Sequence, residues 1–164
     1  VERGEWPKVS IVTIVRYAVI VGHVVRVAMY PIGAPIRDAG QVRLLNRLKQ
    51  HLPSPPWDWA LEGPVRTDDL RAFDAIAANG SARIGFDAWT HIRDLQAQVR
   101  ASMRKAADSG VDRLVLILAD TRHNRAAVAE AGNALREAFP ATTRQVLAAL
   151  RAGKLPPANG IVFL

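Results

Sequence analysis

The sequence contains no cysteine, and this absence excludes a disulfide framework and any metal site built from thiolates. Its four histidines, His23, His51, His91 and His123, are nowhere three or four residues apart, so no pair has the spacing of metal ligands on one helix face. Since disulfides are rare in reducing compartments, we expect a cytoplasmic protein.

An uninterrupted hydrophobic run long enough to cross a bilayer is also missing. The most apolar stretch, Ser10 to Tyr30, is interrupted by Arg16, His23 and Arg26, although its length approaches the roughly 20 residues that a membrane helix needs. Each arginine near the centre of a span costs about 2.5–3.5 kcal/mol on insertion scales, and its many valines and isoleucines favour strands. We therefore predict buried structure of a soluble protein here, and no membrane partner.

What the sequence does contain is enough apolar material for one globular domain and an excess of positive charge. The chain has 164 residues, of which 49% are hydrophobic, and a formal net charge of +7. A chain of this length buries well over half of its unfolded surface. The charge permits attraction to nucleic acid or to an acidic partner, but it supports solubility equally well.

The first half of the chain predicts one helix and three strands. Apolar residues recur at helical spacing over 36–52, and the prolines from Pro53 to Pro56 end that helix, because proline cannot continue its backbone hydrogen bonding. Asn79-Gly80 is a dipeptide suited to a hairpin turn between the second and third strands. The strands, expected to form an antiparallel meander, are WDWALEGPV (57–65), DDLRAFDAIA (68–77) and SARIGFDAW (81–89).

Helices and strands alternate in the second half. We expect Thr90 to cap a helix that ends at Gly110. The remaining segments are a continuously apolar strand, two helices and a closing strand: DRLVLILAD (112–120), NRAAVAEAGNALREAF (124–139), TTRQVLAALRAGK (142–154) and GIVFL (160–164). This order predicts an α/β (α+β) domain with a mixed sheet and flanking helices. We assign residues 26–164 to that domain and treat 1–25 as a separate apolar segment.

Carboxylates lie on two neighbouring predicted strands, with Asp69, or its neighbour Asp68, at the start of one strand and Asp87 near the end of the next. In metal-dependent nucleases such carboxylates hold a divalent cation that polarises phosphate and activates water, and a lysine two residues after the second acid stabilises charge. That position is Trp89 here, on the same strand face as Asp87, because residues i and i+2 project to one side. An indole neither binds a metal nor supplies positive charge.

Two interpretations of Asp87 remain open. In the first, Asp69 and Asp87 bind Mg²⁺ or Mn²⁺, with Asp74 or the carbonyl of the nearby tryptophan as a third ligand, provided that a bulge brings Asp74 to the same face. In the second, Asp87 is a strand-end residue paired with an arginine such as Arg71 or Arg83.

Several segments, in this order, resemble the C-terminal domain of bacterial helix-turn-helix regulators of the Xre type, which itself is similar to the PD-(D/E)XK restriction-endonuclease-like fold. They extend over about Val25 to Leu164 and include the Tyr30-Pro31, Asp94-x-Gln96 and Thr121–Arg125 motifs. The segments are YPIGAPIRDAGQVRLLNRL, WALEGPV, DLRAFDA, FDAWTHIRDLQAQVR and LVLILADTRHNRAAV.

The resemblance implies a restriction-endonuclease-like domain of a DNA-associated transcriptional regulator, here without a recognisable helix-turn-helix in the first 30 residues. It assigns Asp69 and Asp87 to the two acids of the nuclease motif, Trp89 to the place of the lysine, and Gln96 to the candidate site residues. Because the lysine is replaced, the expected function is non-catalytic, with a Mg²⁺-dependent DNA endonuclease as the alternative.

Arginines on the helices that flank these carboxylates are candidates for weak, sequence-independent contact with DNA phosphates, since arginine forms bidentate bonds to phosphate. The segment ADTRHNRAAV is read either as an anion site at a helix start or as a capped helix with solvated arginines. A third hypothesis is a homodimer or protein partner bound through the apolar segment 11–29. The candidate arginines are Arg93, Arg100, Arg104, Arg122 and Arg125.

Overall fold

The computed structural model describes residues 10–22, 39–65 and 71–164, and the chain divides into two compact units, Val1–Ile36 and Arg37–Leu164. The domain boundary expected between residues 25 and 26 lies outside the described residues, as do Asp68 and Asp69.

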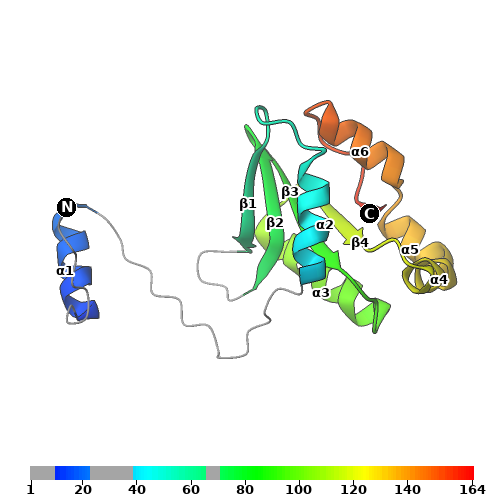
Figure 1. Ribbon diagram of the computed structural model, residues 1–164, viewed down its shortest axis with the longest axis horizontal. Coiled ribbons are helices and arrows are strands. Elements are labelled where there is room, and N and C mark those ends of the chain that lie inside the picture. Colours follow the sequence, from blue (N-terminus) through cyan, green and yellow to red (C-terminus); the bar gives the residue numbers. More distant parts are fainter. Residues whose placement is uncertain (1–9, 23–38, 66–70) are drawn as a thin grey trace. The chain divides into compact units, whose positions relative to one another are not determined.

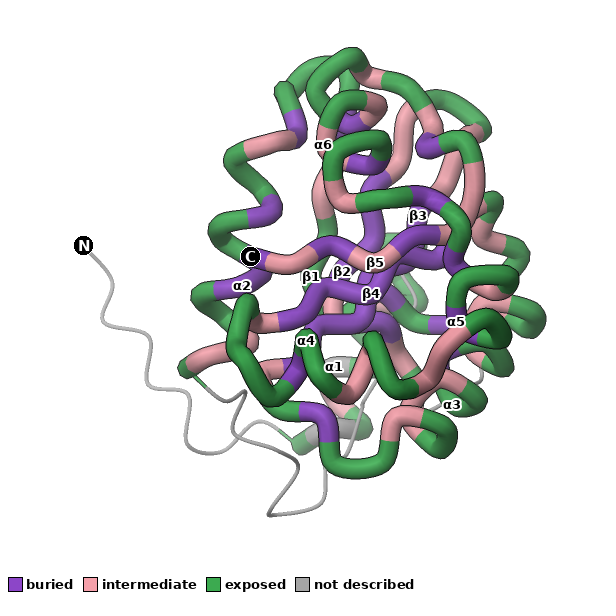
Figure 2. The backbone as a smooth tube through the Cα atoms, turned by 90° about the vertical axis from the view of Figure 1, so that its right-hand side faces the viewer, coloured by how far each residue is buried: buried purple, intermediate pink, exposed green. Residues whose placement is uncertain are grey.

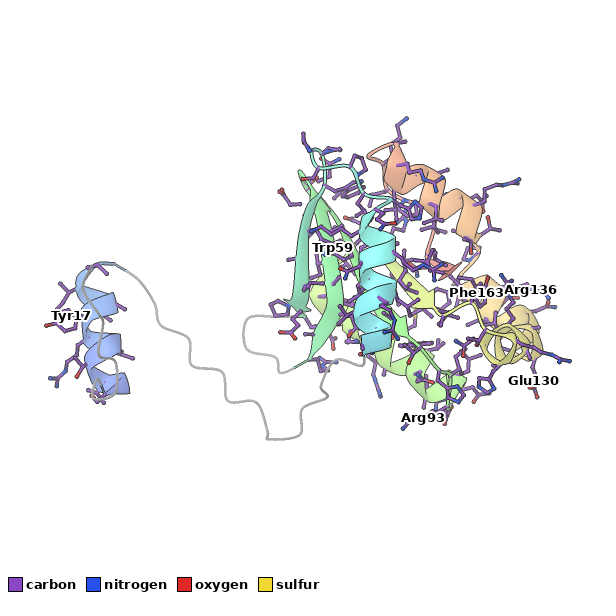
Figure 3. All side chains as sticks on the ribbon, in the orientation of Figure 1. Tyr17, Trp59, Arg93, Glu130, Arg136 and Phe163 are labelled. Atoms are coloured by element: carbon purple, nitrogen blue, oxygen red, sulfur yellow. The ribbon has the colours of Figure 1, made fainter. Side chains whose placement is uncertain are left out.

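The described residues of the first unit form the short helix α1 (Ile11–Ile20), whose N-cap residue Ser10 accepts a hydrogen bond from the Thr13 amide. Several large apolar side chains of this helix are exposed, with 68% of Tyr17 (Figure 3) and 77% of Ile20 accessible to solvent. The preference for strands predicted from the β-branched residues is wrong for Ile11–Ile20, where a capped helix forms. The rest of that apolar segment, residues 23–30, lies outside the described residues. In the part of the chain that the structure describes, no helix is long and apolar enough to span a membrane.

The described residues of the second unit form a mixed sheet of five strands in the order β1-β2-β3-β4-β5. Strands β1 to β4 are labelled in Figure 1, and β5 is labelled beside β4 in Figure 2. The first three strands pair antiparallel and the last two add in parallel, which confirms the predicted meander and mixed sheet. A two-residue turn joins β2 and β3, with Gly80 at a φ of +59°. The strands are β1 (Asp58–Pro64), β2 (Ala72–Asn79), β3 (Ala82–Trp89), β4 (Arg113–Leu118) and β5 (Gly160–Phe163).

Helices cover both faces of this sheet. On one face α2 (Ala39–Lys49) and α6 (Thr143–Arg151) pack against a first hydrophobic cluster, and on the other α3 (Leu95–Ser109), α4 (Arg122–Glu130) and α5 (Gly132–Ala138) pack against a second. Side chains of strand β4 alternate between the two clusters, and the strand is buried from Leu114 to Leu118 (Figure 2). Such a run is expected where a parallel strand is covered on both faces.

The helix after β3 begins later than predicted. Asp94, and not Thr90, is the N-cap of α3, where its side chain accepts a hydrogen bond from the Ala97 amide at 2.9 Å. The end of α3 matches the prediction, because Gly110 adopts a left-handed conformation there. Thr90 instead lies in a connection that is bound to α4 through its carbonyl, which accepts a hydrogen bond from Asn124.

The outer edge of β5 is closed by the start of α6. Ala141 forms a bridge with Gly160, and the Thr143 hydroxyl donates to the carbonyl of Ile161 and accepts from the amide of Phe163. The hydroxyl thus satisfies a backbone acceptor and a backbone donor that an additional strand would otherwise bind.

Candidate functional site

Asp87 lies in the central strand β3 with 2% of its side chain exposed, and its carboxylate is bound by two residues of α3. Ser102 donates its hydroxyl hydrogen to one carboxylate oxygen, and the Lys105 ammonium lies 2.5 Å from the other. Ser102 and Lys105 are three residues apart, so one turn of α3 presents both to the same strand. The buried negative charge is therefore neutralised from a single helix.

The Lys105 ammonium also contacts strand β2. It donates a hydrogen bond to the Ala72 carbonyl at 3.2 Å and lies 5.4 Å from the centroid of the Phe73 ring, within the range of a cation–π contact. The second interpretation expected an arginine such as Arg71 or Arg83 to pair with Asp87. A cation does bind this carboxylate, but it is Lys105. Arg71 pairs with Asp108 at 2.7 Å instead.

Strand β2 is irregular next to this cluster. Phe73 packs in the second hydrophobic cluster, whereas Ala75 and Ala77 pack in the first, so the alternation of faces breaks at Asp74. There the Asp74 carboxylate accepts a hydrogen bond from the Ala88 amide at 2.7 Å. Asp74 was considered as a third metal ligand. One oxygen of its carboxylate instead takes part in the hydrogen bonding between β2 and β3.

The metal-binding prediction can be judged only for the described residues, since Asp69 lies outside them. Among these residues no group of three or more histidine or acidic side chains is arranged to hold a metal ion. Trp89 lies on the Asp87 side of β3, as predicted, and packs in the second hydrophobic cluster. Asp87 forms a buried ion pair, in which the Lys105 ammonium supplies the positive charge that balances the carboxylate.

The remaining candidates on and before α3 are exposed. Gln96 lies in the first turn of the helix, and Arg93 precedes its N-cap (Figure 3). Arg100 and Arg104 are four residues apart and hence neighbours on one face of the helix. These side chains are exposed to solvent. Ser102 and Lys105 of the same helix instead face the sheet and bind Asp87.

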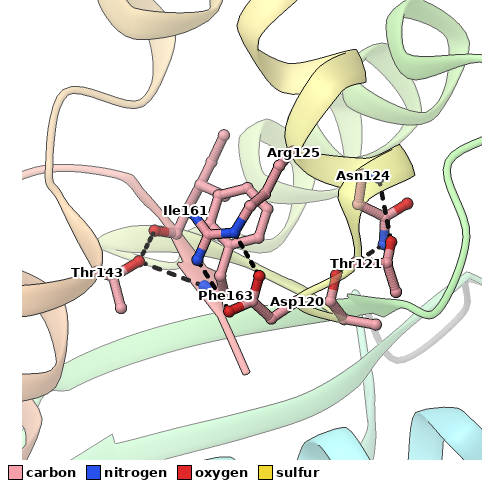
Figure 4. A network of polar contacts seen from close by, with 8 residues as sticks. Asp120, Thr121, Asn124, Arg125, Thr143, Ile161 and Phe163 are labelled. Carbon is pink, nitrogen blue, oxygen red and sulfur yellow. Dashed lines mark hydrogen bonds and ion pairs between the residues drawn. The ribbon is translucent and has the colours of Figure 1, made fainter.

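The two candidate arginines of α4 have different surroundings. Arg122 is exposed, whereas Arg125 forms an ion pair with Asp120 and lies 4.7 Å from the centroid of the Phe163 ring (Figure 4). The hydrogen bond from Arg125 lowers the pKa of Asp120, and the same contact raises the pKa of Arg125. Arg125 is thus already compensated by a carboxylate, in contrast to the anion site considered for this segment.

Asn124 is a structural residue that the sequence did not reveal. It is fully buried at the start of α4, accepts a hydrogen bond from the Ile92 amide and donates to the carbonyls of Thr90 and Ala119. Thr121 caps the helix by accepting from the Asn124 amide at 3.1 Å (Figure 4). One side chain therefore fixes the loop after β3 to the end of β4.

Lys105 is the other residue missed, although its position carried a signal. Val99, Ser102 and Lys105 follow one another at three-residue steps, which places them along the inner side of the predicted helix. A serine and a lysine on that side require a polar partner in the sheet. Asp87 was the buried acid available on the neighbouring strand.

No family model matches the chain, and comparison with curated proteins and with solved structures gave no significant match.

Proposed function

We propose that this chain is a non-catalytic, restriction-endonuclease-like domain of a DNA-associated transcriptional regulator, and that it contacts the phosphate backbone of nucleic acid. The observation that carries the non-catalytic part is the buried ion pair between Asp87 and Lys105. A carboxylate that binds an ammonium and a hydroxyl has both oxygens occupied and would have to release them before it could bind Mg²⁺.

The order of elements supports the proposed fold. A helix, an antiparallel meander of β1 to β3, the crossover helix α3 and the parallel strand β4 follow one another as the resemblance requires. Asp87 lies within the third strand of that meander. Its position beside α3 is consistent with a nuclease-like arrangement in which a helix residue has taken over the charge at the acid.

The exposed arginines support contact with a polyanion. Arg93, Arg100, Arg104 and Arg122 all reach solvent, and the chain has a net charge of +7. Contacts to phosphates alone give micromolar or weaker affinity, with little preference between sequences. The logarithm of the binding constant should fall with the logarithm of the salt concentration by about 0.9 per phosphate contacted.

Fluorescence anisotropy with two labelled duplexes of unrelated sequence, titrated at several salt concentrations, tests this function. We expect similar affinities for both duplexes and a reduced salt slope for the double variant Arg100→Ala/Arg104→Ala. The variant Arg144→Ala removes an exposed arginine from α6, which packs on the other face of the sheet, and serves as the charge control. Absence of binding at low salt would reject nucleic-acid contact.

The catalytic alternative is tested by nicking of supercoiled plasmid with Mg²⁺ and with Mn²⁺. We expect the wild type and Asp87→Asn to show the same background, after thermal melting has established that the variant is folded. Nicking that requires the metal and is lost in Asp87→Asn would overturn the non-catalytic assignment and establish an endonuclease.

Exposed apolar side chains on α1 favour a second function, association with another copy or with a protein partner. Val12, Tyr17, Val19 and Ile20 each have more than 60% of their surface accessible in this helix. Sedimentation velocity of the full chain and of Tyr17→Ser/Ile20→Ser tests this function. We expect self-association of the wild type that the substitutions weaken, and a strict monomer at high concentration would reject the homodimer.

A further inference from the structure

Two exposed histidines stack on each other at the edge of the sheet where parallel strands end. His91 lies in the loop that follows β3, and His123 lies in the first turn of α4, after β4. Their ring centroids are 4.1 Å apart, and the ring planes are tilted by only 10°. Ligands of open sheets with parallel strands bind outside the carboxyl ends of these strands. The ring pair therefore lies at an edge where a ligand is expected.

The ring pair is held in place by hydrogen bonds between the loop and α4. The Nε2 nitrogen of His123 binds the Ile92 carbonyl at 2.8 Å. Asn124 accepts a hydrogen bond from the Ile92 amide and donates to the Thr90 carbonyl, so the backbone on both sides of His91 is bound to the same helix. A surface that is already ordered loses little conformational entropy when a ligand binds.

Nearly parallel rings suit stacking better than metal binding. The lone pairs of ring nitrogens lie in the ring planes, so those of two parallel imidazoles do not converge on one ion. Both histidines are exposed, and among the described residues no other aromatic ring contacts either of them. The outer faces of the pair therefore remain available for a planar ligand.

Cations accompany the ring pair. Arg93 and Arg122, close to the two histidines in the sequence, are exposed. The neighbouring carboxylates are engaged elsewhere, because Asp94 caps α3 and Asp120 pairs with Arg125. Flat rings beside cations fit a nucleobase with its phosphates, since bases stack on aromatic side chains and arginine binds phosphate.

We propose that the stacked imidazoles of His91 and His123 bind an unpaired base of single-stranded nucleic acid, with Arg93 and Arg122 contacting the adjacent phosphates. The inference rests on the proposed function, contact with nucleic acid, and names the form of nucleic acid that this edge recognises. Within a duplex the faces of the bases are covered by neighbouring bases, whereas an unpaired base offers its face to a protein ring.

Fluorescence anisotropy of the full chain with three labelled ligands tests the inference. The ligands are a short oligothymidine strand, an abasic strand of the same length and a duplex. The abasic strand carries the same phosphates without bases, so it measures the contribution of charge alone. We expect oligothymidine to bind at least about fivefold more tightly than the abasic strand, as the stacking of one base would give.

Three substitutions of His91 separate the ring from the charge. His91→Ala removes the ring and should weaken oligothymidine binding about fivefold, while binding of the abasic strand stays within about twofold. His91→Phe keeps a flat ring and should retain oligothymidine binding within about twofold. His91→Lys supplies charge without a ring and should not restore the preference for oligothymidine over the abasic strand.

Aromatic resonances of the ¹³C-labelled chain locate the contact. Stacking of a base should shift the imidazole resonances of His91 and His123 with oligothymidine but not with the abasic strand. His51, which accepts a hydrogen bond from Arg151 of α6, is the internal control and should not shift. Equal shifts of all three histidines would overturn the site.

The binding results distinguish this inference from the proposed function. If oligothymidine and the abasic strand bind equally, or if His91→Ala changes neither affinity, the stacking site is overturned while contact with the nucleic-acid backbone stands. If oligothymidine binds and the duplex does not, the stacking site stands and the contact with duplex DNA is overturned. Absence of binding to all three ligands at low salt would overturn both.

Discussion

Removing the Lys105 ammonium should destabilise the protein strongly, because Asp87 would keep a buried charge without its counter-ion. Lys105→Met suits this test, since methionine preserves an unbranched apolar stem beside Phe73. Loss of one partner of a buried ion pair costs about 3–5 kcal/mol. Ser102 would still donate to the carboxylate, and 17% of the Lys105 side chain is exposed, so that water can approach. We therefore expect about 3 kcal/mol, at the lower end of that range.

For a domain of this size a loss of 1 kcal/mol lowers the melting temperature by roughly 3–5 °C, so Lys105→Met should melt roughly 10–15 °C below the wild type. Thermal and urea unfolding followed by circular dichroism would measure both quantities. Asp87→Asn/Lys105→Met leaves a neutral amide that still accepts from Ser102, and it should recover at least half of the loss. Arg100→Met, an exposed position of the same helix, should change stability by less than about 0.5 kcal/mol.

The reasoning would be refuted if Lys105→Met melted within about 3 °C of the wild type, a change that corresponds to less than 1 kcal/mol. It would also fail if the double variant were no more stable than Lys105→Met alone. Either result would mean that the charge of Asp87 is solvated or neutralised by something other than Lys105.

Other substitutions test the fold around the site. Asn124→Ala should cost about 2–3 kcal/mol in urea unfolding, because the buried Ile92 amide loses its partner and two partly buried carbonyls each lose one hydrogen bond, whereas the exposed control Asn133→Ala should be nearly neutral. Gly85→Ala should cost about 1–3 kcal/mol, since an added Cβ would lie 2.8 Å from the Phe73 ring, and an unchanged melting temperature would contradict that packing. Burial and an arginine of α6 lower the pKa of His51, so the folded state binds fewer protons and the contribution of His51 to stability is lost as pH falls below about 6.5. His51→Gln should therefore lose less stability than the wild type between pH 7 and pH 5, and parallel pH profiles would refute this role.

The sheet could be predicted from the sequence because its signals are local. The continuous apolar run of β4 and the hairpin turn at Gly80 each identify their element within a few residues. The start of α3 was misplaced because Thr90 and Asp94 are both good caps. Asn124, more than 30 residues away in the sequence, binds Thr90 and Ile92 in a non-helical loop and so decides in favour of Asp94.

The candidate site was harder to predict, since it depends on contacts between distant segments. Asp87 was identified, but its partner comes from the next helix and could be chosen only when the rotation of α3 about its axis was known. A bulge near Asp74 was considered from the sequence, and the alternation of faces in β2 does break there, but the bond from a backbone amide to the Asp74 carboxylate depends on the neighbouring strand. Glu62, which has a φ of +54°, lies at the matching position of β1.

The hydroxyl of Thr143 affects whether copies of this chain can associate through the edge of the sheet. An open sheet edge invites a strand from another chain, which is the first step of domain swapping and of amyloid growth. At β5 that recruitment is blocked, because Ala141 and Thr143 already hold the backbone groups of the edge. The opposite edge, β1, keeps a kink at Glu62 and a proline at its end, Pro64, both of which disfavour strand addition. Addition of a further strand is therefore disfavoured at β5 by occupied hydrogen-bonding groups and at β1 by the backbone conformation of Glu62 and by Pro64.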